Sequence, residues 1–259
     1  MTEAFYLPRD ENRFISTDHT RGPWTSEAQH AGPPSALLGR AVERLGEDDF
    51  QVARITFEIL GPVPVDELTV RAEIVRPGRN VELVEASLSA SDGEVMKARA
   101  WLIRRQELAF EAPSVDLSPP PGPENGRETG ELPEVGYLRA METRFVAGAF
   151  TKPGPATAWF RMRHVLVEGE DISPLVRVLI AADSGNGISA SIDWSKWFFI
   201  NTDLSVYLHR MPDGEWVCLD ALTIPEQHGM GIAVSTISDQ RGTIGRGLQS
   251  LYIGPRAGS

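Results

Sequence analysis

The sequence has almost no cysteine and no long hydrophobic run. A single cysteine, Cys218, among 259 residues excludes internal disulfides and cysteine-based metal clusters, and its strand-like surroundings favour a buried thiol. No run of about 18 apolar residues is present, so we expect no membrane-spanning helix. The first residues lack a basic region followed by an apolar core, so we expect no signal peptide and, by default, a cytoplasmic protein.

Positive charge is also scarce. The chain has 25 Lys and Arg against 36 Asp and Glu, which gives a formal net charge of −11. The excess of negative charge argues against nucleic acid and anionic membranes as partners. Arginines such as Arg76, Arg79 and Arg104 could still bind a phosphate, because screening limits the reach of charge to about 8 Å at physiological salt. Four histidines show no metal-ligand spacing: His30, His164, His209 and His228. We therefore expect no metal and no cofactor.

The remaining composition, with 41% apolar and 24% charged residues, is typical of a globular protein. After a stretch at 1–29 that we expect to be irregular, prolines in a first turn, a helical apolar pattern and Gly46 as a stop predict a helix over about 33–46. Four strands are predicted to follow, at 53–60, 67–76, 81–89 and 94–105. Short turns join them, so neighbouring strands should be antiparallel.

A stretch rich in Pro, Gly and Glu at 109–136 predicts a linker between two units, residues 1–108 and 137–259. The second unit begins with predicted strands near 137–150 and 156–167. A helix over 171–183 follows, with Asp171 or Ser173 as its cap and Pro174 in its first turn. Further strands are predicted at 198–210, 215–224, 229–238 and 243–253. Both halves thus contain a helix followed by an antiparallel meander, which predicts the α+β class.

Three polar side chains of the second unit fall on faces that should be apolar. Asp183 lies on the apolar stripe of its helix, and Thr202 and Gln249 each share a strand face with apolar side chains, such as Leu204 and Leu251. A buried polar group costs free energy unless it meets a partner or a ligand. The position in the first unit that corresponds to Gln249, counted from the last turn of each unit, is Ala100. The second unit is therefore the predicted carrier of the functional site.

Several short motifs carry a resemblance to a known family. They are Gln-His-Ala-Gly-Pro-Pro at 29–34, Arg-Pro-Gly-Arg at 76–79, Ala-Ala-Asp at 181–183, the stretch 201–210 with its His-Arg ending, and Gly-Leu-Gln at 247–249. From about residue 22 to 253, the chain resembles the double hotdog (TesB-like, type II) acyl-CoA thioesterases. The resemblance implies a tandem hotdog, in which two antiparallel sheets each wrap a central helix. It also implies an acyl-CoA thioesterase, a hydrolase of lipid metabolism, and a homodimer.

The resemblance further implies roles for particular residues. In this family an Asp, a Thr or Ser and a Gln hold the water that attacks the thioester, and the matching positions here are Asp183, Thr202 and Gln249. With Asp183 as the base, no covalent intermediate is needed. The amide near Gly32, at a helix N-terminus, would polarise the thioester carbonyl. Two tryptophans of the insert at 185–198 would line the acyl pocket: Trp194 and Trp197.

Other interpretations stay open. A hotdog hydratase or dehydratase would need an Asp and a His close together in one run, and residues 183–187 offer no such His. A non-catalytic acyl-binding or assembly protein is compatible with the same fold, because a fold does not dictate function. Asp183 could also simply end its helix, and the tryptophans could be packing residues.

Overall fold

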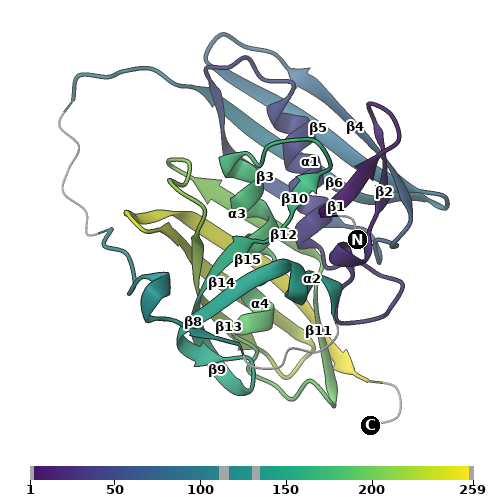
Figure 1. Cartoon of the computed structure of the whole chain (residues 1–259), viewed down its shortest axis with the longest axis vertical. Helices are drawn as coiled ribbons and strands as arrows, with labels where there is room; N and C mark the ends of the chain where they lie inside the picture. The colour runs from purple at the N-terminus through teal and green to yellow at the C-terminus, as the bar shows by residue number, and fades with distance from the viewer. Residues whose placement is uncertain (1–2, 111–116, 130–134, 257–259) are drawn as a thin grey trace.

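The computed structural model describes residues 3–110, 117–129 and 135–256, and shows two similar units side by side (Figure 1). In the first unit, α1 (Gly32–Glu43) packs on one antiparallel sheet. The strands of this sheet are β3 (Phe50–Ile59), β4 (Glu67–Arg76), β5 (Val81–Ala90) and β6 (Gly93–Arg104). The first unit therefore follows the predicted plan of one helix and an antiparallel meander.

The second unit contains α3 (Pro174–Ala182) and the short α4 (Gly185–Ile188), both packed against its strands. Its strands are β8 (Met141–Ala149), β9 (Lys152–Met162), β10 (Val165–Val167), β11 (Trp197–Asn201), β12 (Asp203–Leu208), β13 (Val217–Pro225), β14 (Met230–Asp239) and β15 (Gly242–Pro255). Helix α3 begins where predicted, because the Ser173 side chain accepts a hydrogen bond from the Val176 amide and Pro174 occupies the first turn.

The sheets of the two units are joined edge to edge. Strand β3 pairs with β12 in antiparallel register, so all the strands lie along one continuous hydrogen-bonded sheet. Helices α1 and α3 contact each other inside it, and two glycines permit their close approach. A Cβ on Gly32 would overlap the carbonyl oxygen of Ile180, and a Cβ on Gly39 would overlap the Leu179 side chain. The α+β tandem hotdog class is confirmed, with the two predicted sheets joined into one through β3 and β12.

The prediction that residues 1–29 are irregular is wrong. They contain β1 (Ala4–Pro8), β2 (Arg13–Ser16) and the 3₁₀ turn η1 (Asp18–Thr20). Strand β1 pairs in parallel with β10 of the second unit, and β2 pairs with β4 of the first. These strands are too short to show a clear period, and their partners lie far away in the sequence, so no local pattern predicts them.

The stretch at 109–136, predicted as a linker, contains ordered structure in its described part. It holds η2 (Pro123–Asn125), β7 (Arg127–Glu128) and the start of α2 (Gly136–Ala140), while the predicted linker residues at 111–116 and 130–134 lie outside the described residues. Strand β7 pairs with β8, and the Trp159 indole N–H donates to the Pro121 carbonyl at 2.7 Å. Helix α2 also replaces the first residues of the strand predicted at 137–150. This part of the stretch is therefore attached to the second unit.

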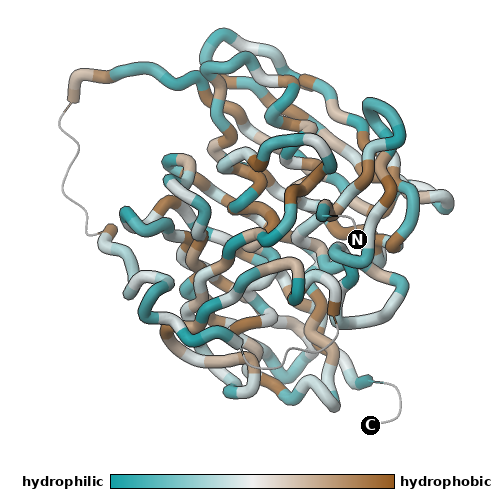
Figure 2. The backbone as a smooth tube through the Cα atoms, in the orientation of Figure 1, coloured by the Kyte–Doolittle hydropathy of each residue, from teal (hydrophilic) through white to brown (hydrophobic). Residues whose placement is uncertain are grey.

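The apolar core lies between the helices and the inner faces of the strands. Figure 2 shows hydrophilic segments mainly in the peripheral turns. Cys218 is buried, and this burial raises the pKa of its thiol, in agreement with the predicted buried cysteine. Within the described ranges, no helix has the length and apolar character that a membrane span requires.

Candidate active site

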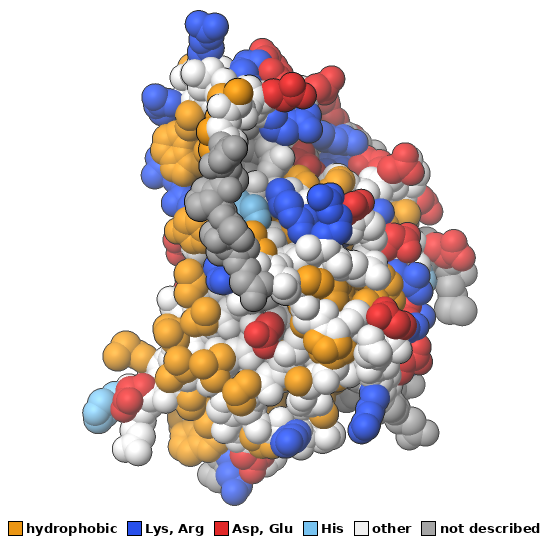
Figure 3. Space-filling view, turned by 90° about the vertical axis from the view of Figure 1, so that its left-hand side faces the viewer, with side chains coloured by type: hydrophobic (Ala, Val, Ile, Leu, Met, Phe, Trp, Pro, Cys, Tyr) orange, Lys and Arg blue, Asp and Glu red, His pale blue; other side chains and the backbone are white. Residues whose placement is uncertain are grey.

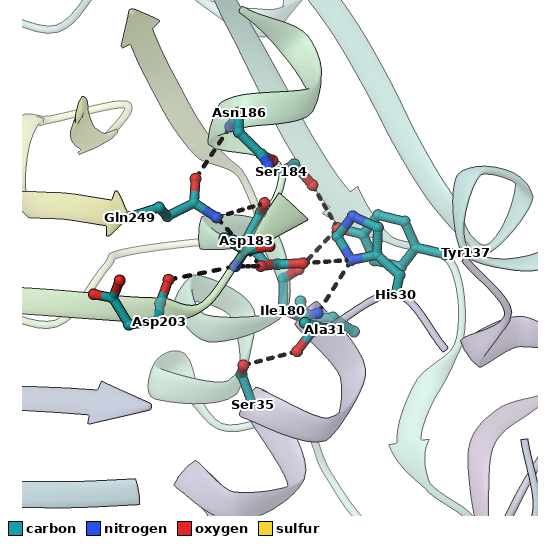
Figure 4. Close-up of polar contacts among 12 residues, drawn as sticks. His30, Ala31, Ser35, Tyr137, Ile180, Asp183, Ser184, Asn186, Asp203 and Gln249 are labelled. Carbon is teal, nitrogen blue, oxygen red and sulfur yellow. Dashed lines mark hydrogen bonds and ion pairs between the residues drawn. The ribbon is translucent and has the colours of Figure 1, made fainter. Parts of the chain in front are cut away.

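Asp183 is the C-cap of α3, and the residue is buried with only 4% of its surface exposed. Its Oδ1 accepts hydrogen bonds from the Asn201 amide at 2.8 Å and from the Gln249 amide at 3.3 Å. Its Oδ2 lies 3.0 Å from Nδ1 of His30. Figure 4 shows Gln249 and His30 reaching Asp183 from opposite sides. Three polar side chains from different elements thus contact the buried carboxylate. A buried charged group requires such partners, because burial without them costs free energy.

Gln249 faces inward from β15, as predicted from its strand parity, and is buried. Its Nε2 also lies 3.2 Å from the Asp183 carbonyl oxygen, and its Oε1 accepts from the Asn186 backbone amide at 3.1 Å. The second contact fixes α4 against the strand, and Gly185 allows this approach because a Cβ there would lie 2.5 Å from the Ser235 hydroxyl. The structure therefore places Gln249 in contact with Asp183. Both the nitrogen and the oxygen of its side-chain amide form hydrogen bonds.

Thr202 is not brought to this cluster: its side chain is exposed, so the prediction that it faces the core is wrong. Asn201 pairs with Leu251 and Ser205 pairs with Leu248, so four steps on one strand oppose three on β15. Thr202 lies in this bulge, between β11 and β12. The extra residue shifts the alternation of side chains along the strand. Asn201, rather than Thr202, therefore points to the inner face of the sheet. No local sequence signal marks the bulge.

His30 is the second functional candidate that sequence reasoning missed, because an isolated histidine is usually structural. Its ring stacks on Tyr137 with centroids 3.7 Å apart. The Tyr137 hydroxyl donates to the Ile180 carbonyl at 2.8 Å and lies 2.9 Å from the Ser184 hydroxyl, which fixes the stacking surface. Burial lowers the pKa of His30, although Asp183 opposes this effect, so the imidazole is neutral near pH 7.

The Nδ1 atom of His30 has two polar neighbours and can serve only one of them at a time. The Gly32 amide lies 3.1 Å away and points its N–H at Nδ1, while the Asp183 carboxylate lies 3.0 Å away. A ring nitrogen carries either one lone pair or one hydrogen. When Nδ1 carries hydrogen and donates it to an ionised Asp183, it no longer accepts from Gly32. The Gly32 N–H is then available to another acceptor, at the N-terminus of α1.

A cavity of about 1070 Å³ begins at this cluster. His30 and Ser184 lie on its wall, and His30 is the more accessible member of the Asp183 pair, with 14% of its side chain exposed. Much of the remaining lining is apolar: Leu138, Val146, Phe145, Phe150 and Trp194. The space can hold an apolar group next to a polar, partly buried reaction centre.

The two tryptophans that were predicted to line the acyl pocket lie in different places. Trp194 lines the cavity and stacks on Trp24 at 5.1 Å between ring centroids. Trp197 is 41% exposed and is not part of the cavity wall. It shares the face of Phe199 and Asn201 but lies at the start of β11, opposite Pro255 near the end of β15, where the strand extends beyond the core.

Metal ligands do not gather near the cluster. Across residues 3–110, 117–129 and 135–256, no group of three or more His, Cys, Asp or Glu side chains is arranged to hold a metal ion. The polar residues here form a carboxylate–imidazole pair flanked by two amides. Such a set can orient a water molecule, remove a proton from it and return that proton to a leaving group.

Family models match both halves of the chain. The model of the acyl-CoA thioesterase N-terminal domain matches residues 20–103, and the model of the C-terminal domain matches residues 112–253, more than half of the chain. The chain belongs to the acyl-CoA thioesterase family. The prediction that it is an acyl-CoA thioesterase is thereby confirmed at the level of the family. The search of curated proteins found no significant match.

Solved structures of similar proteins share the whole fold of this thioesterase family member. A putative thioesterase from Novosphingobium aromaticivorans is 22% identical, with a TM-score of 0.73 over 96% of this chain and 98% of that chain. A putative thioesterase II from Thermobifida fusca is 15% identical, with a TM-score of 0.77 over 97% and 96%. The acyl-CoA thioesterase II TesB2 from Mycobacterium marinum is 15% identical, with a TM-score of 0.68 over 98% and 96%. At these identities the likeness concerns the fold.

Proposed function

We propose that this chain hydrolyses acyl-CoA thioesters by direct attack of a water molecule that the Asp183–His30 pair activates. The observation that carries the proposal is the buried Asp183 carboxylate, paired with a histidine on the wall of a largely apolar cavity. Asn201 and Gln249 hold the carboxylate from its other side. In this proposal Asn201 takes the place that sequence reasoning gave to Thr202.

The proton path follows from the tautomer of His30. A neutral imidazole that donates Nδ1–H to Asp183 has its lone pair on Nε2. Water in the cavity loses a proton to Nε2 while its oxygen forms a bond to the thioester carbonyl carbon. Asp183 stabilises the resulting imidazolium. The tetrahedral intermediate then breaks its C–S bond, and the imidazolium returns the proton to the CoA sulfur, so that free acid and CoA leave.

The Gly32 amide is the proposed donor to the carbonyl oxygen. It lies at the N-terminus of α1, where N–H groups and the helix dipole favour developing negative charge. Donation from His30 to Asp183 releases this N–H from Nδ1. The same tautomer of His30 therefore leaves Nε2 able to accept a proton and leaves the Gly32 N–H able to bind the carbonyl oxygen. Gly32 has a structural role too, because any Cβ there would overlap Ile180 of α3.

The cavity supports an acyl group as the buried part of the substrate. Leu138, Phe145 and Phe150 offer apolar contacts, and Trp194 limits the space near Trp24. The net charge of −11 favours a binding mode in which the anionic CoA stays at the surface. The cytoplasmic location and the homodimer stay predictions.

The decisive experiment measures thiol release from a panel of short- to long-chain acyl-CoAs with wild type and Asp183→Asn. We expect the variant to lose about 1000-fold in kcat while it still binds acyl-CoA, because the imidazolium loses its counter-charge. Asp220→Asn, at an exposed aspartate of β13, is the matched control and should retain activity. A non-catalytic acyl-binding protein would bind the substrates but release no thiol before any substitution. Full activity of Asp183→Asn would refute the proposed site.

A further inference from the structure

The rings of His30 and Tyr137 lie face to face in the candidate active site. Their centroids are 3.7 Å apart and their planes differ by 10°, and Figure 4 shows the two rings one over the other. Since stacked carbon atoms are in contact at about 3.5–4.0 Å, this distance leaves little sideways offset between the rings. Among the ring pairs of the described residues, this is the shortest distance between centroids.

Two neutral aromatic rings do not favour such an arrangement. The negative faces of their π systems repel each other, so neutral pairs prefer an offset or edge-to-face contact with centroids roughly 4.5–7 Å apart. Phe145 and Phe150, on the wall of the same cavity, follow that preference with a T-shaped contact at 5.0 Å and 71°. A cation over a ring face is attracted to it instead. The geometry of His30 and Tyr137 therefore suits a protonated imidazole better than a neutral one.

The backbone holds both rings in this position. The His30 N–H donates to the Thr20 carbonyl at 2.8 Å, and the Tyr137 N–H donates to the Arg21 carbonyl at 3.0 Å. Both residues are thus attached to the same turn, at the end of η1. Gly136 permits α2 to approach this turn, because a Cβ there would overlap a carbonyl oxygen of η1. The fold itself therefore sets the distance between the two rings.

The Tyr137 hydroxyl is fixed at the far end of its ring. Its only hydrogen is donated to the Ile180 carbonyl at 2.8 Å, so the Ser184 hydroxyl, 2.9 Å away, donates to the Tyr137 oxygen. Burial raises the pKa of Tyr137, so the phenol keeps its hydrogen and stays neutral. Because the hydroxyl is occupied on both sides, the ring face is the part of Tyr137 that can act on His30.

A positive charge on His30 would be a buried charge. Lys, Arg, Asp and Glu side chains are spread over the face seen in Figure 3, whereas the His30–Asp183 pair lies inside the molecule. Asp183 favours the imidazolium, but burial has the larger effect and lowers the pKa of His30. An imidazolium that forms here therefore needs stabilisation beyond the one carboxylate.

We propose that Tyr137 is a positioning residue whose ring face stabilises the imidazolium of His30 while the thioester is hydrolysed. This inference rests on the proposed function. When Nε2 has taken the proton from water, the imidazolium has the Asp183 carboxylate at Nδ1 and the Tyr137 ring against one face. Because the stack suits the charged ring better than the neutral one, it stabilises the transition state more than the ground state. The stack also fixes the plane of the imidazole, which limits the directions that Nε2 can take.

The first test changes the charge of the ring face and keeps the shape of the ring. Phenylalanine and progressively fluorinated phenylalanines at position 137 are similar in shape, but fluorine withdraws negative charge from the ring face. We expect Tyr137→Phe to stay within about threefold of wild type, and kcat for thiol release to fall stepwise with fluorination to about 30-fold below it, as a lost cation–π contact predicts. KM should change little, because His30 is neutral before the reaction. A kcat that stays constant along the series would overturn the proposal.

The second test does not depend on activity. NMR titration follows the pKa of the His30 imidazole, and the spectrum of His30→Gln identifies its signal among the five histidines. Tyr137→Leu should lower this pKa by roughly one unit, because the imidazolium loses the ring face, and the acid limb of the kcat/KM profile should move to lower pH by the same amount. Tyr137→Phe should leave both in place. Water that enters a loosened site would raise the pKa of His30, so the direction of the shift separates the two causes.

Phe14→Leu is the matched control, since it removes a buried ring of β2 that lies outside the cavity wall. It should lower thermal stability, as Tyr137→Leu does, but leave the acid limb in place. A pKa of His30 that rises or stays constant in Tyr137→Leu would overturn the proposal. If Tyr137→Leu does not fold, the fluorinated series, which keeps the ring, decides. If wild type releases no thiol, the proposed function fails, and the titration of wild type and Tyr137→Leu still decides whether Tyr137 stabilises the imidazolium.

Discussion

The two units share a plan but differ on both faces of the same hairpin. In the first unit the inner face carries Ala100 and the neighbouring outer positions carry the Glu85–Arg99 ion pair. In the second unit the inner face carries Gln249, and the outer positions carry Val234 and Leu248. The second unit therefore has polarity inside, where it serves Asp183, and apolar surface outside. A sheet tolerates either arrangement because alternate side chains face opposite sides.

Neither unit holds the candidate site alone. His30 and Gly32 come from the first unit, at the start of α1, while Asp183, Asn201 and Gln249 come from the second. The close approach of α1 and α3, which Gly32 and Gly39 permit, brings the two sets together. The first unit thus has Ala100 at the position of Gln249 but supplies the histidine and the amide.

The largest expected effect comes from His30, the first unit's contribution. His30→Gln should lower kcat/KM by roughly 1000-fold, because it removes the proposed proton acceptor while keeping a polar side chain. In wild type, the lowered pKa of His30 should place the acid limb of the kcat/KM profile below the ordinary histidine value of about 6.5. Activity should therefore fall only as the pH drops below that value. His228→Gln, at an exposed histidine, is the control. Near-normal activity of His30→Gln would mean that Asp183 contacts the water itself.

The turn of the last hairpin offers a second comparison. Asp239, fully buried in the second unit, accepts from Arg210 at 2.6 Å and from the amides of Asp213 and Arg241, whereas the corresponding position of the first unit is Ala90. We expect Asp239→Asn to lower the free energy of unfolding by roughly 3 kcal/mol, because it breaks a buried ion pair. Thermal unfolding measures this loss. Asp92→Asn, in the exposed turn of the first unit, should change it little.

Acid should weaken the same pair. Burial alone would raise the pKa of Asp239, but hydrogen bonds from Arg210 and from two backbone amides outweigh it and lower the pKa. A carboxylate with a lowered pKa contributes its full stabilisation above the unfolded value of about 3.9, and loses it as the pH falls through the folded value. Wild type should therefore lose stability below about pH 4, and Asp239→Asn should lose less. An equal loss in both proteins would show that Asp239 is not responsible.

Gln249→Ala gives the second unit an alanine at the inward position where the first unit has Ala100. We expect roughly 100-fold lower kcat, because Asp183 loses one donor and α4 loses its contact through the Asn186 amide. KM should change less, since the acyl cavity is lined by other side chains. Gln227→Ala, in an exposed turn, is the control. Unchanged kcat in Gln249→Ala would mean that the polar inner face of the second unit has a structural role only.

Much of this fold could be predicted from local chemistry. Strand β4 has the predicted bounds, and α3 begins close to its predicted start because Ser173 and Pro174 define its first turn. The parity of Gln249 predicts an inward side chain, since β15 pairs regularly along that part. What could not be predicted depends on distant partners. Strand β1 needs β10, and His30 acquires its role only when α1 meets α3.

Asn201 and Thr202 test whether local parity or the bulge between strands decides which residue faces Asp183, and they have the smallest expected effect. Sequence parity favours Thr202 as the inward residue, but the bulge between β11 and β12 turns Asn201 toward Asp183 and leaves Thr202 exposed. We expect Asn201→Ala to lower kcat by about tenfold, the worth of one hydrogen bond to a charged group, because Gln249 and His30 still hold the carboxylate. Thr202→Val should stay within about twofold of wild type, since surface substitutions rarely matter. Thiol release under saturating acyl-CoA compares the two variants directly. If Thr202→Val is the more damaging change, Thr202 holds the water after all, and the strand must lose its bulge when substrate binds.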